Sequence, residues 1–344
     1  MAQPLIYQTL TMMAALLEME PAYTFLRDRY FPTNASLDIF NTEDVLMDIK
    51  DGQQRMAPVV LPRHRGIMVD REPFRTERIT PPFVAPSRRL TLDDLNSRGF
   101  GEALFSDKST EDREAALLGQ DLVDLDRMHD NREEFIAARC MMGNGYELKQ
   151  YGDKVDTDEY VEYELHFYEG ANNPTRFTPA TPWDQNGATI YEDIAAMVRI
   201  LTKAGKPVSD LVGNPAVIDT LLTDDRIYKM LDNRRMEWGN INPETLPEGA
   251  AYYGYITVAG RKVDLFSYDA EFYDAQEQSA EPVFGPGECV LTAPRAGRGL
   301  YGAVSQMEQD DGKFHTYAGT RVPKYIADAD NNIRKLRIAS RPLY

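Results

Sequence analysis

A long amphipathic stretch places the strongest constraint on the fold of this 344-residue chain. Ser109 is a typical N-cap, Glu111 and Asp112 suit a first helical turn, and Gly143 readily takes the left-handed conformation that ends a helix. The pattern predicts a helix of about nine turns, roughly 50 Å long, over residues 109–143. A helix of a bundle or coiled coil would show the same period. The fold must therefore be inferred from the segments on either side of the helix. Apolar residues recur at steps of three and four at Leu118, Leu122, Leu125, Met128, Phe135, Ala138 and Met142.

The segment before this helix is rich in proline, which excludes a helix there. Short β-rich pieces at 56–61 and 66–69 predict a long extended hairpin with few residues to build a core of its own. Residues up to about 45 combine a short amphipathic helix with Phe31-Pro32, where the proline ends the helix, and they predict an arm. Arm and loop are expected to become ordered against neighbouring subunits. The prolines are Pro58, Pro62, Pro73, Pro81, Pro82 and Pro86.

Strand and helix signals alternate after the long helix and predict an α+β fold class. A strand is expected at 160–168, a helix at 190–203 before Gly205 and Pro207, a strand at 211–212 and a helix from Pro215 to Leu222. A hairpin is expected at 253–268 with its turn at Ala259-Gly260, followed by a strand at 289–292.

Charge and cysteine content exclude several classes of protein. The net charge is -17, which disfavours a protein that grips nucleic-acid phosphates. Cys140 and Cys289 lie far apart without metal-ligand spacing, so neither a disulfide framework nor a zinc site is expected, and a reducing compartment fits. Residues 1–20 lack the basic start of a signal peptide, and no apolar run is long enough to span a membrane.

The sequence predicts no catalytic, cofactor or metal site. His64, His129, His166 and His315 stand alone, and most of the abundant carboxylates are expected on solvated faces. Residues 297–302 read GxGxxG, but no apolar first helix of a dinucleotide-binding unit follows them. A nucleotide-dependent enzyme is therefore only a remote alternative.

Several short segments along nearly the whole chain follow a recognisable order. They are Arg29-Tyr30-Phe31-Pro32, 46–62 with Met56-Ala57-Pro58, Phe83-Val84, 139–143, Pro182-Trp183-Asp184, 211–215, 267–274 and Arg341-Pro342-Leu343. In this order the chain resembles the lambda-like family of tailed-phage major capsid protein E. The resemblance implies the tailed-phage major capsid fold (Hong Kong phage-like), which herpesvirus shells share.

The resemblance also implies a division into parts. These are an N-terminal arm at 1–45, an extended loop at 46–92, a peripheral domain at 93–185 and 300–344 whose spine helix is the one at about 109–143, and an axial domain at 186–299.

The function that the resemblance implies is a major capsid protein without enzymatic activity. It would self-assemble as pentamers and hexamers into an icosahedral shell that encloses double-stranded phage DNA without sequence-specific binding, first in the host cytoplasm and finally as the virion capsid. A portal is a further expected partner, and a decoration protein stays open. Arm and loop account for the residues before the spine helix, so a separate scaffolding protein is expected. The alternative is an encapsulin-like compartment, which shares the fold.

Basic residues concentrate between Lys50 and Arg89, whereas the rest of the chain is strongly acidic. We expect this stretch to dock on a neighbouring subunit and to fix its orientation. The other interpretation is that these side chains are solvated or face packaged DNA. The candidate contacts between subunits are Arg55, Arg63, Arg65, Arg71, Arg75 and Arg78.

Overall fold

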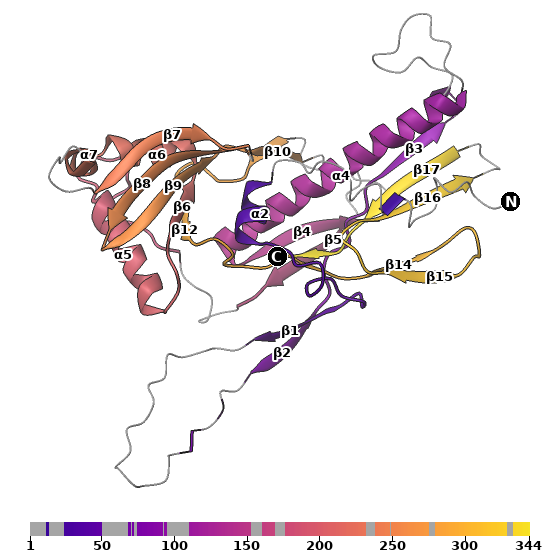
Figure 1. Ribbon diagram of the computed structural model, residues 1–344, viewed down its shortest axis with the longest axis horizontal. Coiled ribbons are helices and arrows are strands. Elements are labelled where there is room, and N and C mark those ends of the chain that lie inside the picture. Colours follow the sequence, from indigo (N-terminus) through magenta and orange to yellow (C-terminus); the bar gives the residue numbers. More distant parts are fainter. Residues whose placement is uncertain are drawn as a thin grey trace, which may run out of the picture.

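The computed structural model of the chain has the predicted α+β composition. It describes residues 12–13, 24–49, 68–69, 71, 74–91, 93–94, 110–152, 160–168, 176–231, 238–247, 249–274, 279–328 and 333–344. Figure 1 shows a long helix lying along one sheet, a second sheet with helices at the other end of the molecule, and a hairpin that leaves the body.

The spine helix α4 (Thr110–Gly143) covers one face of a three-stranded sheet. The sheet has the order β16 (Val322–Asp328), β17 (Ile333–Ala339) and β3 (Ser87–Thr91), all antiparallel. Leu118, Leu122 and Leu125 of α4 pack against Tyr325, Leu336 and Ile338 of the sheet. The predicted helix is confirmed, and its N-terminal half buries the apolar stripe as expected.

Two details of α4 differ from the sequence prediction. Gly143 is the last helical residue, and the left-handed position falls to Asn144, with φ 58°. Met128 is 48% exposed, because the buried stripe continues from Leu125 through His129, Glu133 and Ile136. Polar residues thus occupy buried positions where the prediction placed a methionine.

Four smaller antiparallel pairs also belong to the described part of the chain. They are β4 (Gly145–Tyr151) with β5 (Tyr160–His166), β13 (Leu300–Tyr301) with β18 (Pro342–Leu343), β14 (Val304–Met307) with β15 (Phe314–Tyr317), and β10 (Glu271–Asp274) with β11 (Ser279–Pro282).

The other end of the molecule is a five-stranded sheet whose order is β12-β6-β9-β8-β7. Its strands are β12 (Cys289–Thr292), β6 (Asp210–Gly213), β9 (Arg261–Tyr268), β8 (Ala250–Val258) and β7 (Gly239–Thr245). Helices α5 (Ile190–Lys203), α6 (Pro215–Thr223) and α7 (Asp225–Leu231) pack their apolar side chains against it. The predicted elements agree closely. Ala259 and Gly260 both have positive φ, as a two-residue hairpin turn requires.

The short helix α2 (Phe25–Tyr30) lies between these two parts. Phe25, Leu26 and Tyr30 are buried in a cluster that also holds Ile136 of α4 and Phe266 of β9. The helix ends before Phe31-Pro32, as predicted. This portion of the arm is therefore ordered within its own subunit, and the expectation that the whole arm needs neighbours is wrong for α2.

The hairpin of β1 (Val45–Ile49) and β2 (Arg75–Ile79) extends away from the body (Figure 1). Its register runs from Val45 opposite Ile79 to Ile49 opposite Arg75. The predicted β piece at 56–61 and the first half of the one at 66–69 lie outside the described residues. Met68 and Val69 are described and belong to no strand, so the prediction is wrong for these two residues. None of the helices in the described part of the chain is both long enough and apolar enough to cross a membrane.

Candidate functional site, a buried charge junction beside the spine helix

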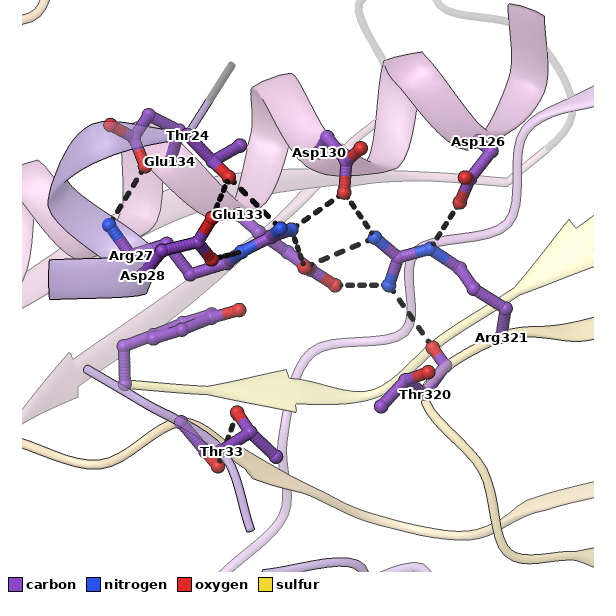
Figure 2. A network of polar contacts seen from close by, with 12 residues as sticks. Thr24, Arg27, Asp28, Thr33, Asp126, Asp130, Glu133, Glu134, Thr320 and Arg321 are labelled. Carbon is purple, nitrogen blue, oxygen red and sulfur yellow. Dashed lines mark hydrogen bonds and ion pairs between the residues drawn. The ribbon is translucent and has the colours of Figure 1, made fainter. Parts of the chain in front are cut away.

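Two arginines from distant parts of the chain meet three carboxylates of α4 (Figure 2). Arg27 of α2 places Nη1 2.6 Å from Asp130 Oδ1 and 3.0 Å from Glu133 Oε2. Arg321, which directly precedes β16, places Nη1 2.5 Å from Glu133 Oε1, Nη2 2.8 Å from Asp130 Oδ1 and Nε 2.8 Å from Asp126 Oδ1. We call Arg27, Asp126, Asp130, Glu133 and Arg321 the charge junction. It ties the N-terminal segment and the C-terminal segment to the spine helix.

Burial makes the pairing in the junction obligatory. The Glu133 side chain is 1% exposed, and that of Arg321 is 10% exposed. Burial would raise the pKa of Glu133, but the attraction of Arg321 outweighs it and holds that pKa below its usual range. Burial would likewise lower the pKa of Arg321, and the charge of Glu133 raises it instead. Both groups are therefore charged, and each offsets the lost hydration of the other.

Two tyrosines extend the junction to the end of the chain. Tyr301 in β13 donates its hydroxyl to Glu133 Oε2 at 3.0 Å. The Tyr301 hydroxyl also lies 2.8 Å from the hydroxyl of Tyr344. Both tyrosine side chains are buried, so residues from β13 and from the segment after β18 close the junction.

Helix α2 is fixed on two sides. Glu134 accepts hydrogen bonds from the backbone N–H groups of Leu26 at 2.7 Å and Arg27 at 2.9 Å, which have no partner within the helix. On the other side, Arg29 Nε lies 2.7 Å from Asp210 Oδ2, and its guanidinium sits 4.6 Å from the centre of the Phe266 ring. Burial raises the pKa of Glu134 to about 7, although its N–H donors act in the opposite direction. Through α2, the spine helix and the five-stranded sheet are held together.

His129 continues the buried polar row on α4. Its Nε2 donates to the carbonyl oxygen of Ile338 at 3.0 Å, whereas Nδ1 has no hydrogen-bond partner. Burial, together with the nearby charge of Arg321, lowers the pKa of His129 to about 4, although Glu133 and Asp130 act in the opposite direction. His129 is therefore neutral in the folded protein at neutral pH.

This burial predicts a loss of stability in mild acid. An unfolded histidine gains its proton near pH 6.5, whereas the folded one resists protonation until about pH 4, so stability falls as the pH drops between these values. Between pH 7 and pH 4 the His129 contribution is about 3 kcal/mol, since one pKa unit equals about 1.4 kcal/mol. His129→Gln keeps a donor for Ile338 and should have a shallower pH dependence by that amount. Urea unfolding of both proteins across this range measures it, and parallel profiles would contradict it.

A further polar cluster lies on the exposed surface of the β4–β5 hairpin. Glu147, Glu164 and His166 bring their ligand atoms within 4.8 Å of one another, a spacing that could hold a metal ion. His166 Nε2 lies 2.8 Å from Glu164 Oε1. The expectation that His166 stands alone is therefore wrong, because Gly145 and His166 face each other and bring Glu147 opposite Glu164.

Comparison of the sequence with models of protein families identifies the family of the chain. The model of the family described as phage major capsid protein E matches residues 8–344. The chain belongs to this family. It is a structural capsid protein that forms the virion shell of a phage, and the function inferred from the resemblance is confirmed at this level.

One of three similar solved structures, a prophage protein with a TM-score above 0.5, supports the fold of this capsid protein. A prophage protein from E. coli CFT073, described as a capsid protein, is 16% identical with a TM-score of 0.58, and the match covers 95% of this chain and 90% of that one. The capsid of Ralstonia phage GP4 is 10% identical with a TM-score of 0.45, covering 95% and 87%. An encapsulin from Synechococcus elongatus PCC 7942 is 11% identical with a TM-score of 0.38, covering 100% and 88%. No curated protein matches the chain. The tailed-phage capsid fold predicted from the sequence is confirmed.

The predicted contact arginines are only partly visible in the capsid protein. Arg55, Arg63 and Arg65 lie outside the described residues, and Arg71 is exposed. Arg75 pairs with Glu77 at 3.1 Å, and Arg78 pairs with Asp44 at the base of the hairpin. These last two charges are thus partly neutralised within the subunit.

The glycines of the GxGxxG motif at residues 297–302 allow other parts of the chain to pack closely against them. A Cβ on Gly297 would lie 2.3 Å from the Phe31 ring, one on Gly299 2.6 Å from Thr33 Oγ1, and one on Gly302 2.5 Å from the carbonyl oxygen of Glu43. The short strand β13 begins inside the motif at Leu300. The glycines therefore let the segment after α2 lie directly against residues 297–302.

The sequence prediction missed the charge junction because it placed the carboxylates on solvated faces. Asp130, Glu133 and Glu134 are 4%, 1% and 0% exposed. One signal was present, since His129 and Glu133 continue the helical spacing of Leu118, Leu122 and Leu125. Polar residues on the apolar stripe of a long helix indicate a buried network that needs partners.

Proposed function

We propose that the protein assembles as pentamers and hexamers into the icosahedral shell of a tailed phage, and that this shell encloses double-stranded DNA. Its role is structural, without catalysis. Assembly takes place in the host cytoplasm with a separate scaffolding protein and a portal. The observation that carries the proposal is the β1–β2 hairpin, which extends from the body without a core of its own.

The hairpin exposes apolar side chains that a lone subunit leaves in water. Leu46 is 61% exposed and Phe74 66% exposed, and Val69, in the segment between the strands, is 60% exposed. Isolated two-stranded hairpins are only marginally stable in water. A neighbouring subunit that covers these side chains would stabilise the hairpin and bury the apolar surface.

The hairpin fits the proposed division into an arm at 1–45, an extended loop at 46–92, a peripheral domain at 93–185 and 300–344 and an axial domain at 186–299. Strand β3 pairs with β17, so residues 87–91 at the end of the loop also belong to the sheet of the peripheral domain. The part that reaches over a neighbour is accordingly 45–79.

The arginines of the loop supply a test of this docking. Changing Arg63, Arg65 and Arg71 together to Glu should impair assembly and leave the fold of the isolated subunit intact, because several ion pairs at an interface steer docking and fix orientation. Raised salt should weaken wild-type assembly as screening grows. Sedimentation and circular dichroism measure the two effects.

The matched control replaces the same three residues by lysine, which keeps the charge. This variant should assemble like the wild type, apart from any loss of bidentate arginine pairing. Normal shells from the glutamate variant at low salt would exclude the docking role of these side chains.

A further inference from the structure

The cationic side chains on the two faces of the β16–β17–β3 sheet differ in whether they pair with carboxylates. On the face that α4 covers, Arg88 Nη1 lies 2.9 Å from Asp121 Oδ1 and 2.7 Å from Asp124 Oδ2, and Arg334 pairs with Glu114. All three carboxylates belong to the spine helix. The cations on this face are therefore neutralised within the subunit.

The opposite face gathers four cations without such partners. Lys324 of β16 stands opposite Arg337 of β17, and Lys335 of β17 stands opposite Arg89 of β3. Residues directly opposite each other in a sheet share a face, and so do residues two apart along a strand. We call Arg89, Lys324, Lys335 and Arg337 the basic sheet face. Within the described part of the chain, none of these four side chains forms an ion pair with a carboxylate.

This arrangement is unfavourable in a lone subunit. Like charges directly opposite each other destabilise a sheet. Burial lowers the pKa of Lys324, and the charge of Arg337 lowers it further, with Glu308 opposing both. Arg337 donates Nη2 to Gln306 Oε1 at 3.1 Å, but its buried Nε has no hydrogen-bond partner. The face thus holds four cations whose charge Glu308 only partly offsets, on a chain whose net charge is -17.

We propose that the basic sheet face docks against an acidic surface of a second copy of the capsid protein. This proposal rests on the proposed assembly into a shell. A shell brings many copies of one acidic chain together, and their repulsion must be offset where they touch. A basic face meeting carboxylates of the neighbour lowers this repulsion and selects the orientation of the contact.

The double substitution Lys324→Glu with Lys335→Glu separates docking from folding. Within the subunit it converts both like-charge pairs into opposite-charge pairs, so the thermal midpoint of the unassembled subunit should stay equal or rise. Between copies it places glutamates against an acidic surface, so the yield of shells at low salt should fall by at least about tenfold. The control, Lys324→Arg with Lys335→Arg, keeps the charge and should assemble normally.

The outcomes distinguish the partners. Shell yield equal to wild type in the glutamate variant would overturn the proposal. If its shells form normally but retain less DNA, the face contacts phosphates and docking between copies is likewise overturned. A lower thermal midpoint together with lower yield would show a structural role and also overturn it. If the wild type itself forms no shells, the proposed function fails, and this proposal fails with it.

Discussion

Replacing Arg321 with Met should lower the free energy of unfolding of the subunit by about 3–5 kcal/mol. The methionine fills much of the volume but leaves Asp126, Asp130 and Glu133 in a buried space with only Arg27 to balance them. Loss of one partner from a buried network costs far more than loss of an exposed pair. Urea unfolding of the purified subunit measures the change.

Two matched variants make this prediction specific. Arg176→Met breaks the exposed pair with Glu288 and should change stability by about 0–1 kcal/mol. Adding Glu133→Gln to the Arg321 variant should recover part of the loss, because one uncompensated charge is removed. If the Arg321 and Arg176 variants lose the same stability, the junction is not the anchor that its geometry indicates.

The second large effect is expected from a substitution on the buried face of the spine helix. Leu125→Asp should abolish folding, because Leu125 is 1% exposed against Leu336 and Ile338, and a buried unpaired carboxylate costs several kcal/mol. Asp124→Asn, one residue away, should be mild, since the Asp124 side chain is 35% exposed and Arg88 keeps Asp121 as a partner. Soluble expression and circular dichroism compare the two variants. Equal effects would place the buried face of α4 elsewhere.

Elements with local signals could be predicted from the sequence with close boundaries. Helix α5 ends at Lys203, before the left-handed Gly205, and Pro215 opens α6 after the N-cap Asn214. The β8–β9 turn is set by Ala259 and Gly260. In each case the residues that decide the structure lie within a few positions of one another.

Features that depend on distant residues could not be predicted in the same way. Arg27 and Arg321 meet Asp130 although they stand 103 and 191 positions from it. The basic sheet face arises only when β3 pairs with β17 across more than two hundred residues. The charge pattern along the chain therefore predicted a basic loop that includes Arg89. In the structure, strand pairing places Arg89 beside Lys335 on the basic sheet face instead.

Electron microscopy of the purified wild-type chain, assembled at low salt with the proposed scaffolding protein, tests the central claim most directly. We expect closed icosahedral shells built from rings of five and six subunits, with the β1–β2 hairpin of each subunit lying over its neighbour. A compact monomer or dimer that forms no shell under these conditions, and whose β1–β2 hairpin resists proteolysis without a partner, would contradict it.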